Sequence, residues 1–302
     1  MTAISRTSVR NTVKRWSDAG VAWGFLTPWV IGFVVFSAFP ILFSFVLSLT
    51  KWNMLGKPQF VGLSNYKELF SSNSGFGHTL LVTFVFTIIN VAISIICSLI
   101  LAMLLNLKVR FKGLFQFFYY VPTIMPSVVM AGCLVLMFNP QLGIVNYIFN
   151  CLGVSNPPNW TGSNTLVWVV VAYASIFTFQ TGQQMLVFSA ALKDVPVELY
   201  EAASLDGANS WTRFWHITLP GIAPMLLFNT VSCTVNSFNG AFTLLYPLTG
   251  GGPGNATDVL SLDIYNQAFK NFNMGKASTL AVVLFVIVAI IGAAEFKLMD
   301  RK

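Results

Sequence analysis

Six long runs of apolar residues constrain the fold of this chain more than any other feature of its sequence. They lie at residues 21–49, 79–107, 114–138, 164–190, 221–246 and 277–296. A helix needs about 20 apolar residues to cross the hydrocarbon core of a bilayer, so each run is long enough to span a membrane. The sequence therefore predicts an all-α, polytopic membrane protein with six transmembrane helices.

The low content of charged residues supports a membrane location. Of the 302 residues, 55% are hydrophobic and only 9% are charged, whereas a soluble domain carries about 25% charged residues. The first apolar run follows a basic stretch, as in a signal peptide, but it is longer than the 7–15 residues that are typical of a signal-peptide core. We therefore interpret it as a retained first span.

Basic residues are distributed unevenly between two sets of connections. Both termini and the connections 108–113 and 191–220 together hold twelve of the 17 Lys and Arg residues, while 50–78, 139–163 and 247–276 hold five. Cytoplasmic loops of membrane proteins are enriched in Lys and Arg, so the first set is predicted to be cytoplasmic. The predicted organisation is a cytoplasmic tail at 1–20, a membrane domain at 21–296 and a cytoplasmic tail at 297–302.

The connection 191–220 has the signals of two short helices separated by a turn. Pro196 suits the first turn of a helix, where its missing N–H costs nothing. Glu198 and Glu201 fall early in that helix, where the helix dipole favours carboxylates. Gly207 suits a helix end with a left-handed residue, and a second helix is predicted from about Ser210 towards Pro220. A protruding helix of this kind suits docking into the groove of a partner protein.

The same connection resembles the "EAA" loop of bacterial ABC importer permeases. The match consists of Glu201, Ala202 and Ala203, then Asp206, Gly207 and Ala208, then Phe214, Ile217, Leu219 and Pro220. The resemblance implies a type I ABC importer permease fold, in which a helix that includes Glu198 inserts into a cleft of a separate ATPase subunit. The alternative is an ordinary amphipathic connector, since Glu-Ala-Ala alone is a weak signal.

Three further segments narrow the resemblance to the carbohydrate-uptake, maltose-type branch of this family. They are 60–66, 138–146 and 249–257, and the last resembles the signature of the first-type permease of a heterodimeric pair. The resemblance implies a homologous second permease, an ATPase dimer and an external sugar-binding protein, in a bacterial inner membrane. The Gly-rich segment 249–257 is also predicted, from composition, to be a flexible outer loop.

Amide side chains inside two spans are candidates for a sugar site. They are Gln180, Gln183 and Gln184 in the fourth span and Ser232, Asn236 and Asn239 in the fifth. Amides offer donors and acceptors to a neutral, hydroxyl-rich ligand, and the resemblance places sugar contacts on the matching two spans. Alternatively, these side chains form hydrogen bonds between helices, as polar groups in membrane bundles often do.

The sequence favours a transport function over catalysis. A GxxxxGK[ST] segment is absent, so ATP and Mg are expected in a partner ATPase and no cofactor in this chain. His78 and His216 are the only histidines and fall on opposite sides of the predicted topology, which counts against an intramembrane enzyme. The predicted function is import of a sugar, a di- or oligosaccharide, by alternating access. The alternatives are a glycerol-phosphate-type ABC permease and, less favoured, a stand-alone secondary transporter, which is expected to carry midplane carboxylates or broken helices.

Overall fold

The computed structural model describes residues 18–71, 74–107, 110–178 and 181–299, and the chain divides into two compact units, Met1–Val46 and Leu47–Lys302. Helix α1 (Asp18–Phe33) continues through the π-helical turn η1 (Val34–Ala38) into α2 (Phe39–Ser48), and this segment belongs to the first unit up to Val46. Ala22–Ser48 has the length and apolarity of a membrane span, as predicted. The wide turn η1 ends two residues before Pro40, whose nitrogen has no N–H for a regular helical bond.

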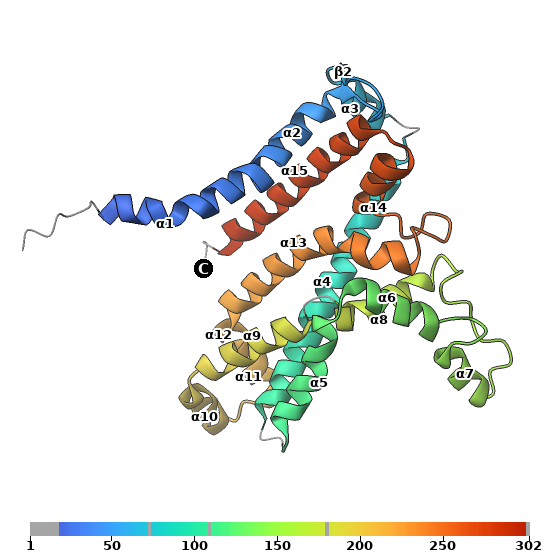
Figure 1. Ribbon diagram of the computed structural model, residues 1–302. Coiled ribbons are helices and arrows are strands. Elements are labelled where there is room, and N and C mark those ends of the chain that lie inside the picture. Colours follow the sequence, from blue (N-terminus) through green and yellow to red (C-terminus); the bar gives the residue numbers. More distant parts are fainter. Residues whose placement is uncertain (1–17, 72–73, 108–109, 179–180, 300–302) are drawn as a thin grey trace, which may run out of the picture. The chain divides into compact units, whose positions relative to one another are not determined.

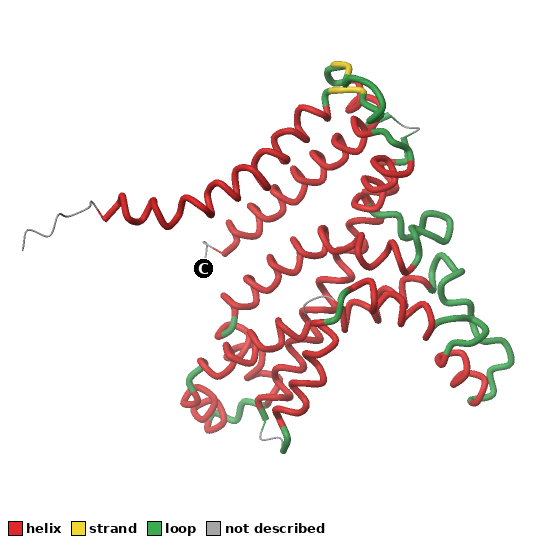
Figure 2. Tube along the Cα trace, in the orientation of Figure 1, coloured by secondary structure: helices red, strands yellow, loops and turns green. Residues whose placement is uncertain are grey.

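The second unit is mostly helical (Figures 1 and 2). Its helices are α3 (Ser64–Leu69), α4 (Phe76–Asn106), α5 (Lys112–Ile124), α6 (Ser127–Met137), α7 (Ile144–Cys151), α8 (Val167–Thr178), α9 (Thr181–Asp194), α10 (Val197–Leu205), α11 (Ser210–Arg213), η2 (Phe214–Thr218), α12 (Leu219–Gly221), α13 (Ala223–Leu248), α14 (Leu260–Tyr265), η3 (Asn266–Lys270) and α15 (Met274–Met299). One small hairpin departs from the all-α prediction, because β1 (Thr50–Lys51) pairs antiparallel with β2 (Gln59–Phe60).

The predicted third span, 114–138, is not one straight helix. It consists of α5 and α6, which meet at an angle of 99°. The break lies at Met125 and Pro126, whose backbones are extended, with ψ of 138° and 132°. A residue before proline avoids the α region because of a clash with the proline ring. Pro126 therefore ends α5, and the predicted third span consists of a bent pair of helices in place of one straight helix.

The other predicted spans are found with different degrees of regularity. In the described chain, α4 and α15 qualify as continuous spans alongside Ala22–Ser48, and the number rises to five if each of two bent helix pairs crosses once. The second bent pair joins Ser210–Gly221 to α13 at 71°. The predicted fourth span corresponds to α8 and α9, which flank two residues outside the described chain.

Helix α4 forms the centre of the second unit and packs most extensively against α9 and α13. At one end it contributes Phe86 to a core with Leu134, Val170 and Leu244. At the other it contributes Leu99 to a second core, whose other members include Met185, Phe188 and Ile222. In a bilayer, such packing is stabilised by van der Waals contact between the helices and not by removal of apolar surface from water. These two cores fix α9 and α13 relative to each other, and therefore position the loop between them.

Candidate functional site

Helix α10 is a short helix with a well-defined end. Gly207 has φ of +78°, the left-handed conformation that glycine adopts without the penalty paid by other residues. The Ala208 N–H donates to Ala203 O at 2.9 Å and the Gly207 N–H donates to Ser204 O at 3.2 Å. These two bonds form the Schellman motif, which satisfies carbonyl groups at a helix end. The predicted helix stop at Gly207 is confirmed.

The segment after Gly207 turns the chain back against α10. Asn209 caps α11, because its side chain accepts a hydrogen bond from the Thr212 N–H at 2.8 Å. Arg213 Nη1 then donates to Ser204 Oγ at 2.8 Å, across the turn. Further along, the Tyr200 and Thr218 hydroxyls lie 3.0 Å apart. Helix α10 is therefore held against the helical segment that leads into α13.

Most of the predicted coupling residues lie on the surface. Glu198, Glu201, Ala202, Asp206 and Gly207 are exposed, and Ala203, Ala208 and Phe214 are half-buried. Phe214 and Tyr200 both pack on the second core described above, which contains Leu99 and Phe188. The site thus has an exposed face, formed by α10, and a packed face, where Tyr200 and Phe214 contact the membrane helices.

Sequence reasoning missed the apolar part of this surface. Leu205 is 90% exposed, Trp211 69% and Trp215 48%, and the two Trp rings meet edge-on at 5.8 Å. Exposed apolar patches of this kind mark interaction sites. The clue in the sequence was the pair of tryptophans in a loop otherwise predicted to face water.

The candidate amide residues fall into three environments. Gln183 and Asn239 are exposed, Ser232 and Asn236 are half-buried, and Gln184 is buried. Asn236 Nδ2 donates to Ser232 O at 2.7 Å, one turn earlier in α13. Gln180 lies outside the described residues. The five described candidates therefore differ in exposure, and Gln183 and Asn239 are the two of them that are most accessible to a ligand.

Gln184, on α9, contacts a polar stripe on α4 that the sequence analysis did not identify. The stripe consists of Thr79, Thr83, Thr87, Asn90, Ser94 and Ser98, all buried. Asn90 Nδ2 donates to Ser237 Oγ at 2.5 Å, and Ser98 Oγ donates to Gln184 Oε1 at 3.5 Å. Intervals of three and four residues place these side chains on one helix face. These hydrogen bonds connect α4 to α9 and α13. For Gln184, the structure therefore shows a hydrogen bond between helices, which is the second of the two roles considered from the sequence.

A close backbone contact joins α5 and α9. The Gly182 N–H donates to Thr123 Oγ1 at 3.2 Å, one turn before the break at Pro126. A Cβ added at Gly182 would lie 2.6 Å from Thr123 Oγ1 and 2.9 Å from Tyr119 O. Only glycine allows this approach of α5 and α9. The contact holds the first turn of α9, which carries Gln183, next to the end of α5.

The three family-like outer segments contain buried polar side chains that fix their backbones. Asn65 Nδ2 donates to the carbonyl oxygens of Ser48 and Thr50, each at 2.9 Å. Asn146 Oδ1 accepts from Trp160 Nε1 at 2.6 Å. In the Gly-rich segment, the fully buried Thr257 donates to Gly252 O at 2.7 Å. The flexible loop predicted for 249–257 is therefore wrong, because internal hydrogen bonds define its conformation.

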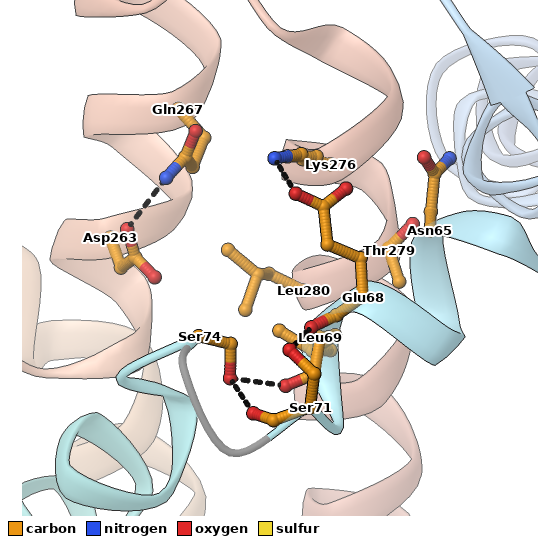
Figure 3. Close-up of a pocket in the computed structure, with 10 residues that line it drawn as sticks. All are labelled: Asn65, Glu68, Leu69, Ser71, Ser74, Asp263, Gln267, Lys276, Thr279 and Leu280. Atoms are coloured by element: carbon orange, nitrogen blue, oxygen red, sulfur yellow. Dashed lines mark hydrogen bonds and ion pairs between the residues drawn. The ribbon is translucent and has the colours of Figure 1, made fainter.

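A cavity of about 310 Å³ lies among α3, α14, η3 and α15. Figure 3 shows Lys276 bonded to Glu68 on one side, at 2.5 Å, and Gln267 bonded to Asp263 on the other, at 3.4 Å. Burial raises the pKa of Asp263, and the Gln267 hydrogen bond opposes this shift. The cavity belongs to the side that the Lys and Arg distribution assigns to the outside.

The neighbouring Asp258 is a further acidic group in the outer connections, besides Glu68 and Asp263. Burial, followed by the charge of Asp263, raises its pKa from 3.8 to about 6, and His78 and Lys270 oppose the shift. Metal binding is not indicated here, since the described residues contain no group of three or more His, Cys, Asp or Glu side chains suited to hold an ion.

Comparison with known proteins identifies the class that this fold and loop define. Residues 94–296 match the family described as "Binding-protein-dependent transport system inner membrane component". The match covers more than half of the chain, so this protein belongs to that family. It is therefore a multi-pass inner-membrane permease, the non-catalytic membrane component of an ABC transport system.

Individual relatives match along nearly the whole chain. The chain is 31% identical to the probable ABC transporter permease protein YesP of Bacillus subtilis (strain 168), over 95% of this chain and 92% of YesP. It is 32% identical to the sn-glycerol-3-phosphate transport system permease protein UgpA of Agrobacterium fabrum, over 92% and 94%. It is 31% identical to the trehalose/maltose transport system permease protein MalF of Thermococcus litoralis, over 91% and 92%.

A solved structure confirms the type I ABC importer permease fold. The chain superposes with a TM-score of 0.81 on a chain of a bacterial ABC transporter involved in the import of alginate, an acidic polysaccharide. The match covers 95% of this chain and 98% of that chain, at 22% sequence identity. At this identity the likeness establishes the fold alone. Together with the family match, it supports the predicted membrane fold despite the break in the third span.

Proposed function

We propose that this chain is one of two homologous permease subunits of an importer that carries a di- or oligosaccharide into the cytoplasm. The other inferred components are an ATPase dimer, which binds ATP and Mg, and an extracytoplasmic sugar-binding protein. In the proposed topology, both termini and 191–220 face the cytoplasm. The membrane domain extends over 21–296, between cytoplasmic tails at 1–20 and 297–302.

The observation that carries the sugar proposal is the exposure of Gln183 and Asn239 on membrane-spanning helices. A polar side chain facing lipid is costly, so such groups normally face a bundle interior or a wet cavity. Residues 113–192 contain no Asp, Glu, Lys, Arg or His, which favours a neutral ligand for the face that includes Gln183. Amides and the nearby half-buried Asn236 provide both donors and acceptors for sugar hydroxyls.

The names of the relatives indicate two substrate classes, and the side chains around Gln183 favour one of them. Relatives named for trehalose/maltose and for starch degradation products transport sugars, while UgpA is named for sn-glycerol 3-phosphate. A phosphate group is usually bound by Arg, Lys or helix N-termini. The absence of basic residues from 113–192 favours the neutral sugar, and glycerol phosphate remains the second candidate.

We further propose that α10 couples the ATPase to the spans. Closure of the ATPase dimer would move α10, and the Tyr200–Thr218 contact would transmit that movement to α13, which carries Asn236 and Asn239. The exposed carboxylates Glu198 and Glu201 and the apolar Leu205 suit a groove on a protein partner. The bundle would then alternate between outward and inward openings as a rigid-body movement.

The substrate assignment is tested with the whole complex in proteoliposomes. Gln183→Ala and Asn239→Ala should each reduce uptake of a labelled maltodextrin, and leave the yield of assembled complex unchanged. Gln141→Ala and Asn150→Ala are matched controls, because both amides are exposed in the 139–163 connection. Normal uptake in both test variants would remove the assignment. Uptake of sn-glycerol 3-phosphate but of no sugar would establish the second candidate.

A further inference from the structure

Helix α7 has two different faces. Its inward face includes Asn146, which is 1% exposed, and Phe149, whose ring meets Trp160 at 5.6 Å. Its outward side, with the residues at either end, is formed by large apolar side chains: Leu142 (90% exposed), Ile144 (57%), Tyr147 (68%), Ile148 (50%) and Leu152 (76%). The intervals of three and four residues form one continuous apolar strip along the helix.

The orientation of this strip is fixed by the contacts of the opposite face. Asn146 Nδ2 donates to the carbonyl oxygens of Pro140 and Pro158, at 3.0 and 3.2 Å, while Asn146 Oδ1 accepts from Trp160 Nε1. Gly143, at the start of α7, leaves no room for a side chain, since a Cβ there would lie 2.5 Å from Asn139 O. Helix α7 therefore cannot rotate its apolar strip inwards without breaking these contacts.

The charge distribution distinguishes this connection from the other two on its side of the membrane. The connection 50–78 carries Lys51, Lys57 and Glu68, and 247–276 carries several Asp and Lys residues. In contrast, 139–163 carries no ionisable side chain apart from Tyr147 and Cys151, and it lies within the stretch 113–192 that lacks Asp, Glu, Lys, Arg and His. It has no charges with which to complement a soluble partner.

We propose that α7 lies flat in the lipid–water interface, with Ile144, Tyr147, Ile148 and Leu152 directed into the lipid. An amphipathic helix in this position buries its apolar face at the boundary between headgroups and acyl chains, and tyrosine is enriched at this depth. Helix α7 follows α6 directly and lies at the edge of the second unit (Figure 1). It anchors the end of the broken α5–α6 pair at the membrane surface.

The test measures the depth of a spin label in the assembled complex. The four cysteines at 97, 133, 151 and 233 are replaced by alanine, and a label is attached at Leu152→Cys or, separately, at Tyr147→Cys. Leu55→Cys is the matched control, because Leu55 is 93% exposed and lies in the charged connection 50–78. The complex is placed in vesicles of equimolar phosphatidylcholine and phosphatidylglycerol, and collisions with oxygen and with a water-soluble nickel chelate are compared.

The proposal predicts that oxygen collides more often than the nickel chelate at positions 147 and 152, with the order inverted at position 55. The logarithm of the oxygen-to-nickel ratio is then positive at α7 and negative at the control. Dominant nickel collisions at 147 and 152 would overturn the proposal in favour of a water-exposed face. Low collision rates with both reagents would overturn it in favour of a face covered by another protein. A label at either position suffices, so failure of one variant to assemble leaves the other to decide.

Discussion

The hydroxyl groups of Tyr200 and Thr218 lie 3.0 Å apart and join α10 to the helical segment that continues into α13. Tyr200 also packs, with Phe214, on the second core that contains Leu99 and Phe188. The Tyr200–Thr218 contact therefore lies against the membrane helices. Because α10 is otherwise mostly exposed, this small set of contacts attaches it to the helical segment that leads into α13.

Replacement of Tyr200 by Phe should weaken this connection with little change in shape. A hydrogen bond of this type contributes about 0.5–1.5 kcal/mol, so we expect a small loss of stability and a larger loss of coupling. Measured in proteoliposomes, ATP hydrolysis should continue while the number of substrate molecules imported per ATP falls. Tyr66→Phe is the matched control, because it removes a hydroxyl that donates to Ser48 Oγ at 2.8 Å on the opposite side. Equal coupling ratios in the two variants would contradict the role of Tyr200.

Gly207→Ala should impair α10 through the backbone alone. Among the described residues, no atom lies within 4 Å of the added Cβ, but the φ of +78° is unfavourable for alanine. The expected cost is about 1–2 kcal/mol. Gly207→Asn should be milder, because asparagine tolerates this conformation better. Hydrogen exchange of the 197–208 amides measures the loss of helix stability. Equal exchange in wild type and Gly207→Ala would show that the conformation does not require glycine.

Gly182→Ala should disrupt the contact between α5 and α9. The new methyl group would lie 2.6 Å from Thr123 Oγ1 and 3.1 Å from Tyr120 Cα, and such overpacking usually costs about 1–3 kcal/mol. We expect a lower thermal unfolding temperature and reduced uptake. Gly132→Ala in α6 is the control, because no described atom lies within 4 Å of its added Cβ. An unchanged unfolding temperature in Gly182→Ala would mean that α5 and α9 separate easily.

The outer connections should lose stability as pH rises from about 4 to about 6. The pKa of Asp258 rises from 3.8 to about 6 in the folded protein, so the folded state binds more protons than the unfolded state across this interval. Stability therefore falls with rising pH there, and is level above it. Asp258→Asn should flatten this part of a plot of unfolding temperature against pH. The control is Asp206→Asn, which alters the exposed carboxylate at the C-cap of α10 and should leave the slope unchanged. A slope that persists in Asp258→Asn would exclude this origin.

Local sequence signals predicted the parts of the fold that depend on local chemistry. Apolar runs of sufficient length identified α4, α13 and α15, and Gly207 marked the end of α10 because no other residue adopts its conformation as readily. The third span was predicted as one apolar run, whose apolarity alone gave no measure of the 99° bend at Met125–Pro126. Local composition also suggested a flexible segment at 249–257, whereas Thr257 and its hydrogen bonds give it a defined structure.

The candidate site was predicted less completely, because exposure depends on which helices meet. Gln183 and Gln184 are adjacent in sequence, yet one is exposed and the other bonds to Ser98 on α4. The α4 stripe was not identified because serine and threonine are common in apolar spans, and only the packing of α9 and α13 shows that these residues share one face. The exposure of the apolar residues Leu205 and Trp211 was missed because it, too, depends on how the helices pack.

The most direct test of the central claim compares co-purification of the ATPase subunit with two matched double variants. Glu201→Ala with Gly207→Ala alters α10, while Glu68→Ala with Gly62→Ala alters a carboxylate and a glycine of positive φ on the opposite side. The account predicts that the ATPase is lost from the first variant, together with substrate-stimulated ATP hydrolysis, and is retained in the second. Retention of the ATPase, of stimulated hydrolysis and of transport in the Glu201→Ala, Gly207→Ala variant would contradict the assignment of α10 as the coupling helix.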